Sequence, residues 1–330
     1  MDVIMEIISI IILVRVSALI LCMAIAAKSD YENLMVADSH WLKWSIIFVF
    51  LLLLEMILLE TSISNYYMIA ALLAIFSIAF FGTPQIKNIL EWKKFEFSIA
   101  LLFLIGFVGI VGGALENQNT DFISLILGEE SPDTVLWWSL ILSMLIISLY
   151  LIAWKSKIIQ GGADIKALIL LTITFPSWSF LPEPLFMEEE ILFRLPPSLV
   201  MFVWAGLVFL LAPPILIFYN YKKGNISSRH DIIMAWHSIK MPIDEIGSKP
   251  VWILTEVLEE EDEIREINRI LPKTNYSMFD EIEEKKNLLK SKGIESAWVA
   301  SKHPFIVYLF LSIIPLLLIG DLFGIIASYF

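Results

Sequence analysis

Long apolar runs are the feature of this sequence that most restricts its fold. Several of them reach the length of about 20 residues that an α-helix needs to cross the hydrocarbon core of a bilayer, and they recur along most of the 330-residue chain. Hydrophobic residues make up 58% of the chain and the mean hydropathy is +0.77, which excludes a soluble domain of ordinary composition. The sequence therefore predicts an all-α, polytopic membrane protein.

We expect about eight transmembrane helices and a small α-helical module, with some β-structure, before the last of them. The expected helices cover residues 5–27, 44–62, 66–83, 97–115, 135–153, 161–176, 198–219 and 304–328. Residues 1–219 then hold seven helices, residues 220–303 form the module and residues 304–330 hold the last helix.

The charges of the expected loops predict how these helices are oriented. Loop 116–134 carries five acids and no Lys or Arg, and loop 177–197 carries four acids and one Arg. The loops of the other side carry Lys28, Lys43, Lys87, Lys93, Lys94, Lys155 and Lys157. Because cytosolic loops collect Lys and Arg, we expect a multi-pass protein of the cell membrane with its N-terminus outside and residues 220–303 in the cytosol.

Within the module, residues 255–270 and 277–292 are expected to be charged helices on either side of a turn at "LPKTNY". Residues 249–254 are expected to form a short strand. We interpret the acidic run at 259–263 as a solvated face of the first helix, and a docking patch for a basic peptide is the alternative.

Composition also excludes several classes of function. The net charge of −12 argues against nucleic-acid binding. Cys22 is the only cysteine, so disulfides and cysteine-based zinc sites are excluded. The four histidines form no His-Glu-x-x-His motif, and neither a Gly-x-Ser-x-Gly motif nor a Gly-rich cofactor loop is present. No metal and no cofactor are expected.

Two carboxylates are expected at the cytosolic ends of separate helices. Asp164 lies at the start of the helix at 161–176, and Asp30 lies three residues after the helix at 5–27. Helix packing could bring them together, and two carboxylates that share one proton can activate water and protonate a leaving amine. The alternative is that Asp164 only complements the helix macrodipole and that Asp30 is a solvated loop residue.

The residues before Asp164 fit the first interpretation. Gly161 and Gly162 lack a Cβ, so they would let a substrate backbone come close to the carboxylate. The two glycines also break the chain before the helix starts, which sets Asp164 in its first turn, and Ala163 is grouped with them as a residue of the substrate approach.

The stretch "GGADIKALILLTITFP" at 161–176 resembles the second signature of the archaeal preflagellin and prepilin peptidases. These are membrane aspartyl proteases of the Gly-x-Gly-Asp type, related to type IV prepilin peptidases. The stretch "SDYENLMVADSHW" at 29–41 is similar to their first signature. The resemblance implies that Asp30 and Asp164 are the catalytic pair and that residues 1–219 are the catalytic region.

The same resemblance implies the substrates and the place of the reaction. They would be precursors of archaellins or pilins that carry a short basic leader and an apolar helix. The endopeptidase would remove the leader at the cytosolic face of the bilayer, and no cofactor would take part.

Four further charged residues are expected to have supporting or structural roles. Asp38 lies in the same expected loop as Asp30 but further from the helix, and we expect it to be dispensable for cleavage. Lys166 is expected to snorkel to the cytosolic interface, and the alternative is that it orients the catalytic pair or a substrate carbonyl. Arg15 and Glu55 lie at similar depth, about 18 Å from the cytosolic helix ends. We expect them to form an interhelical ion pair, since an unpaired charge there is costly.

Two other classes of membrane protein remain as alternatives. An ion- or proton-coupled transporter would use intramembrane acids as relays, but it would need polar residues across the bilayer midplane. An intramembrane protease of the presenilin type would need a Pro-Ala-Leu motif, which this sequence lacks.

Overall fold

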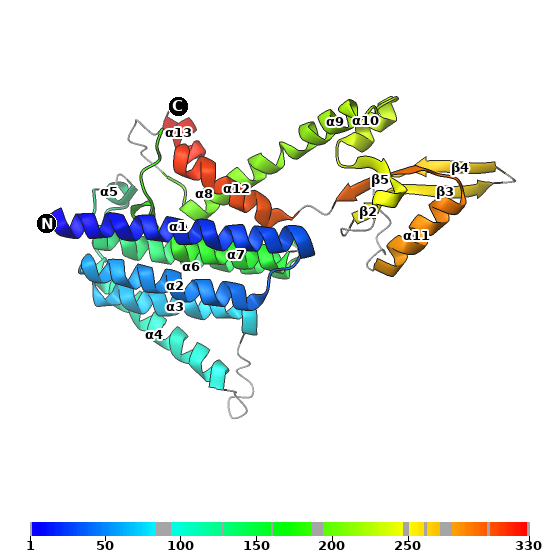
Figure 1. Ribbon diagram of the computed structural model, residues 1–330. Coiled ribbons are helices and arrows are strands. Elements are labelled where there is room, and N and C mark those ends of the chain that lie inside the picture. The colour runs from blue at the N-terminus through cyan, green and yellow to red at the C-terminus, as the bar shows by residue number, and fades with distance from the viewer. Residues whose placement is uncertain are drawn as a thin grey trace. The chain divides into compact units, whose positions relative to one another are not determined.

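The computed structural model describes most of the chain, and Figure 1 shows its elements. The described residues are 2–83, 94–126, 129–159, 161–186, 194–246, 251–260, 263–270, 279–301 and 304–328. They are mostly helical and form two compact units. Unit 1 comprises Met1–Ala26, Val36–Ala205 and Leu309–Phe330, and unit 2 comprises Ala27–Met35 and Gly206–Tyr308.

Six helical stretches of the described residues are long and apolar enough to cross a membrane. They are α1 (Asp2–Asn33), α2 (Asp38–Leu58), α3 (Ile63–Phe81), α4 (Lys94–Glu116), α6 (Pro132–Lys155) and the apolar stretch that joins α8 (Pro197–Phe209) to α9 (Ala212–Lys222). The expected α-helical, multi-pass membrane fold is confirmed. The expected count of eight transmembrane helices is not confirmed, because α7 (Gly162–Thr174) and α12 (Phe305–Leu318) are shorter than a membrane-spanning helix. Two further helices are short: α5 (Phe122–Ile126) and α13 (Leu322–Ser328).

Local chemistry explains where several helices end. α1 runs past its expected end because no Gly or Pro interrupts residues 28–33, and it stops before Leu34, whose φ is 53°. α8 ends before Pro213 and Pro214, which have no N–H groups for the carbonyls of Phe209 and Leu210. Gly320 lies between α12 and α13 with a φ of 80°, a conformation that glycine adopts without steric cost.

Unit 1 is a bundle in which α3 packs against α4 and α6, and α7 packs against α2 and α6. The contact of α4 with its neighbours depends on glycines. A Cβ on Gly106 would lie 2.5 Å from the Cβ of Ala71, and one on Gly113 would lie 1.8 Å from Nε1 of Trp137. In a bilayer, where lipid is as apolar as the helices, such close backbone packing is a main source of helix association.

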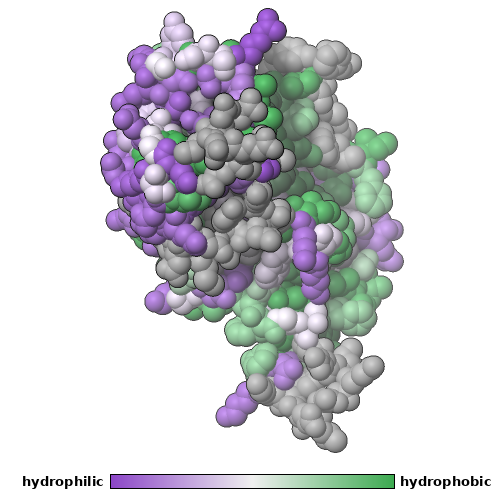
Figure 2. Space-filling view, turned by 90° about the vertical axis from the view of Figure 1, so that its right-hand side faces the viewer, coloured by the Kyte–Doolittle hydropathy of each residue, from purple (hydrophilic) through white to green (hydrophobic). Residues whose placement is uncertain are grey.

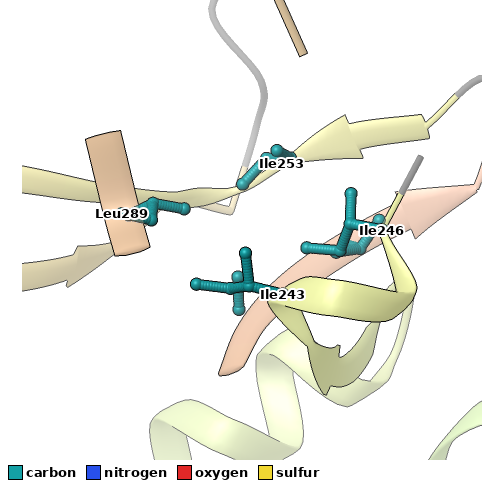
Figure 3. Packing of buried hydrophobic residues seen from close by; sticks show 6 residues of the cluster. Ile243, Ile246, Ile253 and Leu289 are labelled. Carbon is teal, nitrogen blue, oxygen red and sulfur yellow. The ribbon is translucent and has the colours of Figure 1, made fainter. Parts of the chain in front are cut away.

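Unit 2 contains a three-stranded antiparallel sheet with the order β1 (Ile239–Pro242), β5 (Ser296–Ser301) and β2 (Val251–Ile253). Ile239 pairs with Val299, and Val251 pairs with Ser301. The sheet packs with α11 (Phe279–Ser291) around a small core (Figure 3). This core consists of Ile243, Ile246, Ile253, Leu289, Ala297 and Val299.

The expected charged helix at 255–270 is wrong. The described residues of this stretch include an antiparallel pair of strands, β3 (Thr255–Glu260) and β4 (Glu263–Asn268), so Glu259, Glu260 and Glu263 of the acidic run lie in strands and not on a helix face. The buried Thr255 explains the difference, because its hydroxyl donates to Asn268 Oδ1 (2.7 Å) and accepts the backbone N–H of Trp298 in β5 (2.8 Å). These tertiary contacts outweigh the helix propensity of glutamate.

Two other expectations for the module are confirmed. β2 lies within the strand expected at 249–254, and α11 lies within the helix expected at 277–292. The turn expected at "LPKTNY", residues 271–276, lies outside the described residues. Three further elements of unit 2 were not predicted from the sequence: β1, β5 and the short helix α10 (Arg229–Ala235).

Truncating Leu289 tests the core of unit 2. Leu289→Ala is expected to lower the free energy of unfolding of this unit by about 2–5 kcal/mol, because it removes a buried side chain and leaves a cavity. Amide hydrogen exchange of β5 in the purified full chain would rise. The neighbouring Leu288 is half exposed, so Leu288→Ala is the control and should leave exchange unchanged. Equal exchange in the two variants would contradict this packing.

Candidate active site

Asp164 lies in the first turn of α7, whose N-cap is Gly161. Every residue of α7 after Asp164, from Ile165 to Thr174, is buried, whereas Asp164 itself is half-buried. A carboxylate in the first turn is favoured by the unpaired N–H groups of the helix end. The fold therefore holds this acid at the accessible end of a helix that is otherwise enclosed.

The carboxylate of Asp164 lies against Gly161. A Cβ on Gly161 would lie 1.9 Å from Oδ2 of Asp164, which means that the carboxylate rests against the bare Cα. A Cβ on Gly162 would meet only the ring of Trp154, at 3.2 Å. The access of a substrate backbone over these glycines stays a prediction. The contact between Gly161 and the carboxylate of Asp164, which we call the seat of Asp164, is a second reason why glycine suits position 161. Ala163 is half-buried in the same turn.

Asp30 is a helical residue, so its expected place in a loop is wrong. Its carbonyl accepts a hydrogen bond from the N–H of Leu34 (2.9 Å) near the end of α1. Only 7% of the residue is exposed. One carboxylate oxygen, Oδ2, has no hydrogen-bond partner in the described structure, and the carboxyl group accepts a hydrogen bond from the backbone N–H of Ile306 in the first turn of α12.

The pairing of Asp30 with Asp164 stays a prediction, because Asp30 belongs to unit 2 and Asp164 belongs to unit 1. Both carboxylates lie near helix ends, and Asp30 keeps an unpartnered oxygen although it is buried.

Lys166 forms an ion pair with Asp38, and its expected snorkelling to the cytosolic interface stays a prediction. Its Nζ lies 2.6 Å from Oδ1 of Asp38, at the start of α2, and only 11% of the lysine side chain is exposed. The ammonium group also lies 4.9 Å from the ring centroid of Phe80 and 5.9 Å from that of Trp154. Residues two apart on a helix face different sides, so this arrangement directs Lys166 away from Asp164. The pair joins α2 to α7.

The structure brings Arg15 of α1 and Glu55 of α2 together. Nη2 of Arg15 lies 2.6 Å from Oε2 of Glu55, and the two side chains are 0% and 2% exposed. The guanidinium also donates to the carbonyl oxygens of Phe180 and Leu51, both at 3.2 Å. These two carbonyls could not have been found from sequence, because any residue supplies a carbonyl and only the fold selects which one faces the cation.

The described helices define a multi-pass α-helical membrane protein with a small mixed module. Among the described residues, no three His, Cys, Asp or Glu side chains are grouped so that they could hold a metal ion. No protein-family model matches the chain, and no curated protein matches it in sequence. Its assignment to a family therefore stays a proposal.

Removing the counter-charge of Arg15 should destabilise the bundle. Glu55→Gln leaves a fully buried guanidinium without its carboxylate, a change that typically costs about 3–5 kcal/mol. We expect a lower melting temperature of the purified protein, with Glu60→Gln at an exposed position just after α2 as the control. An unchanged melting temperature in Glu55→Gln would show that the pair does not stabilise the fold.

A charge swap is a poor test of the same pair. In Arg15→Glu/Glu55→Arg, the new carboxylate at position 15 would face the carbonyl oxygens of Phe180 and Leu51 instead of donating to them. The swapped protein is therefore expected to stay unstable although the native pair is real.

Proposed function

We infer that this chain is a membrane aspartyl endopeptidase of the preflagellin and prepilin peptidase type. The observation that carries the proposal is the seat of Asp164, whose carboxylate rests against Gly161 at the half-buried start of α7. The contact explains why a glycine precedes the aspartate in the Gly-Gly-Ala-Asp stretch on which the family resemblance rests. The buried Asp30, with its unpartnered Oδ2, supports a second catalytic carboxylate.

The two carboxylates would act as a general acid and a general base. One removes a proton from a water molecule that attacks the scissile carbonyl, and the other gives a proton to the leaving amine. Two close carboxylates cannot both ionise easily, so they would hold one proton between them. Their titration would belong to the pair and not to either residue.

The substrates would be precursors of archaellins or pilins, each with a short basic leader and an apolar helix. The apolar helix of the precursor would lie in the lipid beside the bundle, with the leader at the cytosolic surface. Confinement to the bilayer and a fixed orientation would supply part of the rate. The excess of lysines in the alternate loops supports this orientation, with the N-terminus outside and residues 220–303 cytosolic.

An ion- or proton-coupled transporter is the second candidate, and the buried charges of Arg15 and Glu55 are the observation in its favour. A relay, however, needs acids that exchange protons with water on a path across the membrane. Glu55 is enclosed and held by a guanidinium, so it supports this candidate less well than Asp164 supports the protease.

Replacing single carboxylates tests the catalytic assignment. Asp30→Asn and Asp164→Asn, coexpressed with epitope-tagged archaellin and pilin precursors, should abolish removal of the leader because each loses its acid–base function. Asp38→Asn should retain it, since Asp38 is engaged with Lys166. The gel mobility of the precursor measures the outcome, and size-exclusion chromatography of each variant checks its folding. Leader removal by either of the first two variants would overturn the assignment.

The two glycines provide a matched pair for the geometry of Asp164. Gly161→Ala should reduce cleavage by roughly 10²-fold, because the new Cβ displaces the carboxylate and misplacement by about 1 Å can cost that much. Gly162→Ala should keep most of the activity, because the ring of Trp154 needs to shift by only a few tenths of an ångström. Initial rates of leader removal measure both, and equal rates would rule out the proposed seat.

A further inference from the structure

The short helix α10 presents an apolar face to the outside of unit 2. Its other face is buried, since Met234 and Ala235 pack in a cluster with Leu254, Trp298 and Ala300. By contrast, three neighbouring apolar residues are 47%, 49% and 57% exposed, namely Ile232, Ile233 and Trp236. Trp236 lies four residues after the first of them and three after the second, so the three side chains share one side of the helix. We call them the α10 patch.

The α10 patch is unusual for the water-facing part of this unit. Figure 2 shows largely hydrophilic side chains over the near part of the molecule. Among the described residues after 223 in unit 2, the other exposed large apolar side chains are the isolated Ile270 and Leu288. Apolar side chains clustered on an exposed face indicate a contact surface.

Basic residues accompany the α10 patch although the chain as a whole carries a net charge of −12. Lys222, Lys223 and Arg229 are exposed, and Arg229 lies four residues before Ile233 on the same side of the helix. Asp231 is the only acid between 222 and 236. Burial alone would raise the pKa of Asp231, but hydrogen bonds from Ser227 and Ser228 lower it overall, so this carboxylate serves as a cap for α10.

A buried amide ties α10 and β1 to the end of an apolar span. Asn220, in the last turn of α9, is 0% exposed and its Nδ2 donates to the carbonyl of Ser238 (2.9 Å). Its Oδ1 accepts from the N–H of Lys240 (3.1 Å) and from Nδ2 of Asn225 (3.0 Å). α9 ends the apolar stretch at Lys222, so these bonds hold the α10 patch close to the point where the chain leaves the bilayer.

We propose that the α10 patch, with Arg229, Lys222 and Lys223, is a membrane-contact surface that lies in the headgroup region of an anionic leaflet. Tryptophan beside aliphatic residues and flanking cations is the composition of interfacial segments. The cations would face anionic lipid headgroups while the apolar side chains enter the acyl boundary. The contact would fix the orientation of unit 2 against the bilayer, and it does not depend on which reaction the protein performs.

Contact quenching in a bilayer tests the proposal on the full chain. Ile233→Cys is labelled with a small fluorophore and reconstituted into nanodiscs of phosphatidylcholine and anionic phosphatidylglycerol with brominated acyl chains. Leu288→Cys, on α11 and 50% exposed, is the matched control. Native Cys22 is fully buried, and unmodified protein serves as the labelling blank. We expect quenching several-fold stronger at position 233 than at position 288.

Charge dependence is the second readout. Arg229→Gln in the Ile233→Cys background should weaken the quenching, as should pure phosphatidylcholine in place of the anionic mixture. Equal quenching at positions 233 and 288 would overturn the proposal. Energy transfer between labels on two copies, without quenching by lipid, would also overturn it and would identify the patch as a contact between chains.

Discussion

The enclosure of α7 is the constraint on which the rest of unit 1 depends. Its 13 residues rise only about 20 Å, short of the about 30 Å of a hydrocarbon core, so it cannot serve as a simple span. Its residues from Ile165 onward are all buried, and α2, α3 and α6 are among the helices that pack against them. The packing of α7 thereby fixes the position of its first turn. Gly161, the non-helical residue before that turn, leaves room for the carboxylate of Asp164.

The two ion pairs of this bundle differ in how far their charges are shielded from water. Arg15 and Glu55 are enclosed, and the guanidinium donates its further hydrogen bonds to backbone carbonyls of α2 and of the segment at Phe180. Lys166 instead reaches Asp38, a partner that is itself half exposed. The first pair can satisfy its charges only within the protein, whereas the second connects the buried α7 to the surface.

Much of the fold could be predicted because apolar runs of membrane length leave the chain few alternatives to helices. The ends of the helices were harder to predict. In α1, residues 28–33 are polar but compatible with a helix, so a prediction from hydropathy ended the helix at residue 27 and placed Asp30 in a loop. The hairpin at 255–268 was missed because its glutamates favour a helix locally, while the contacts of Thr255 with Asn268 and Trp298 come from tertiary structure. The seat of Asp164 depends on a φ, ψ combination and a rotamer that residue identity alone does not specify, although the glycine itself was a signal.

The contrast between Asp164 and Glu55 bears on what kind of protein this is. Both are acids in helices of an apolar bundle, but Glu55 is neutralised by a cation and closed off from water, whereas Asp164 is half-buried at a helix start. A carboxylate paired with a guanidinium, as Glu55 is, is held in its ionised form and is a poor proton donor or acceptor, whereas Asp30 keeps a carboxylate oxygen without a hydrogen-bond partner in the described structure and Asp164 is half-buried at a helix start. The buried charges of Arg15 and Glu55 are therefore explained by the packing of the bundle, and the proposed catalytic role is confined to Asp30 and Asp164.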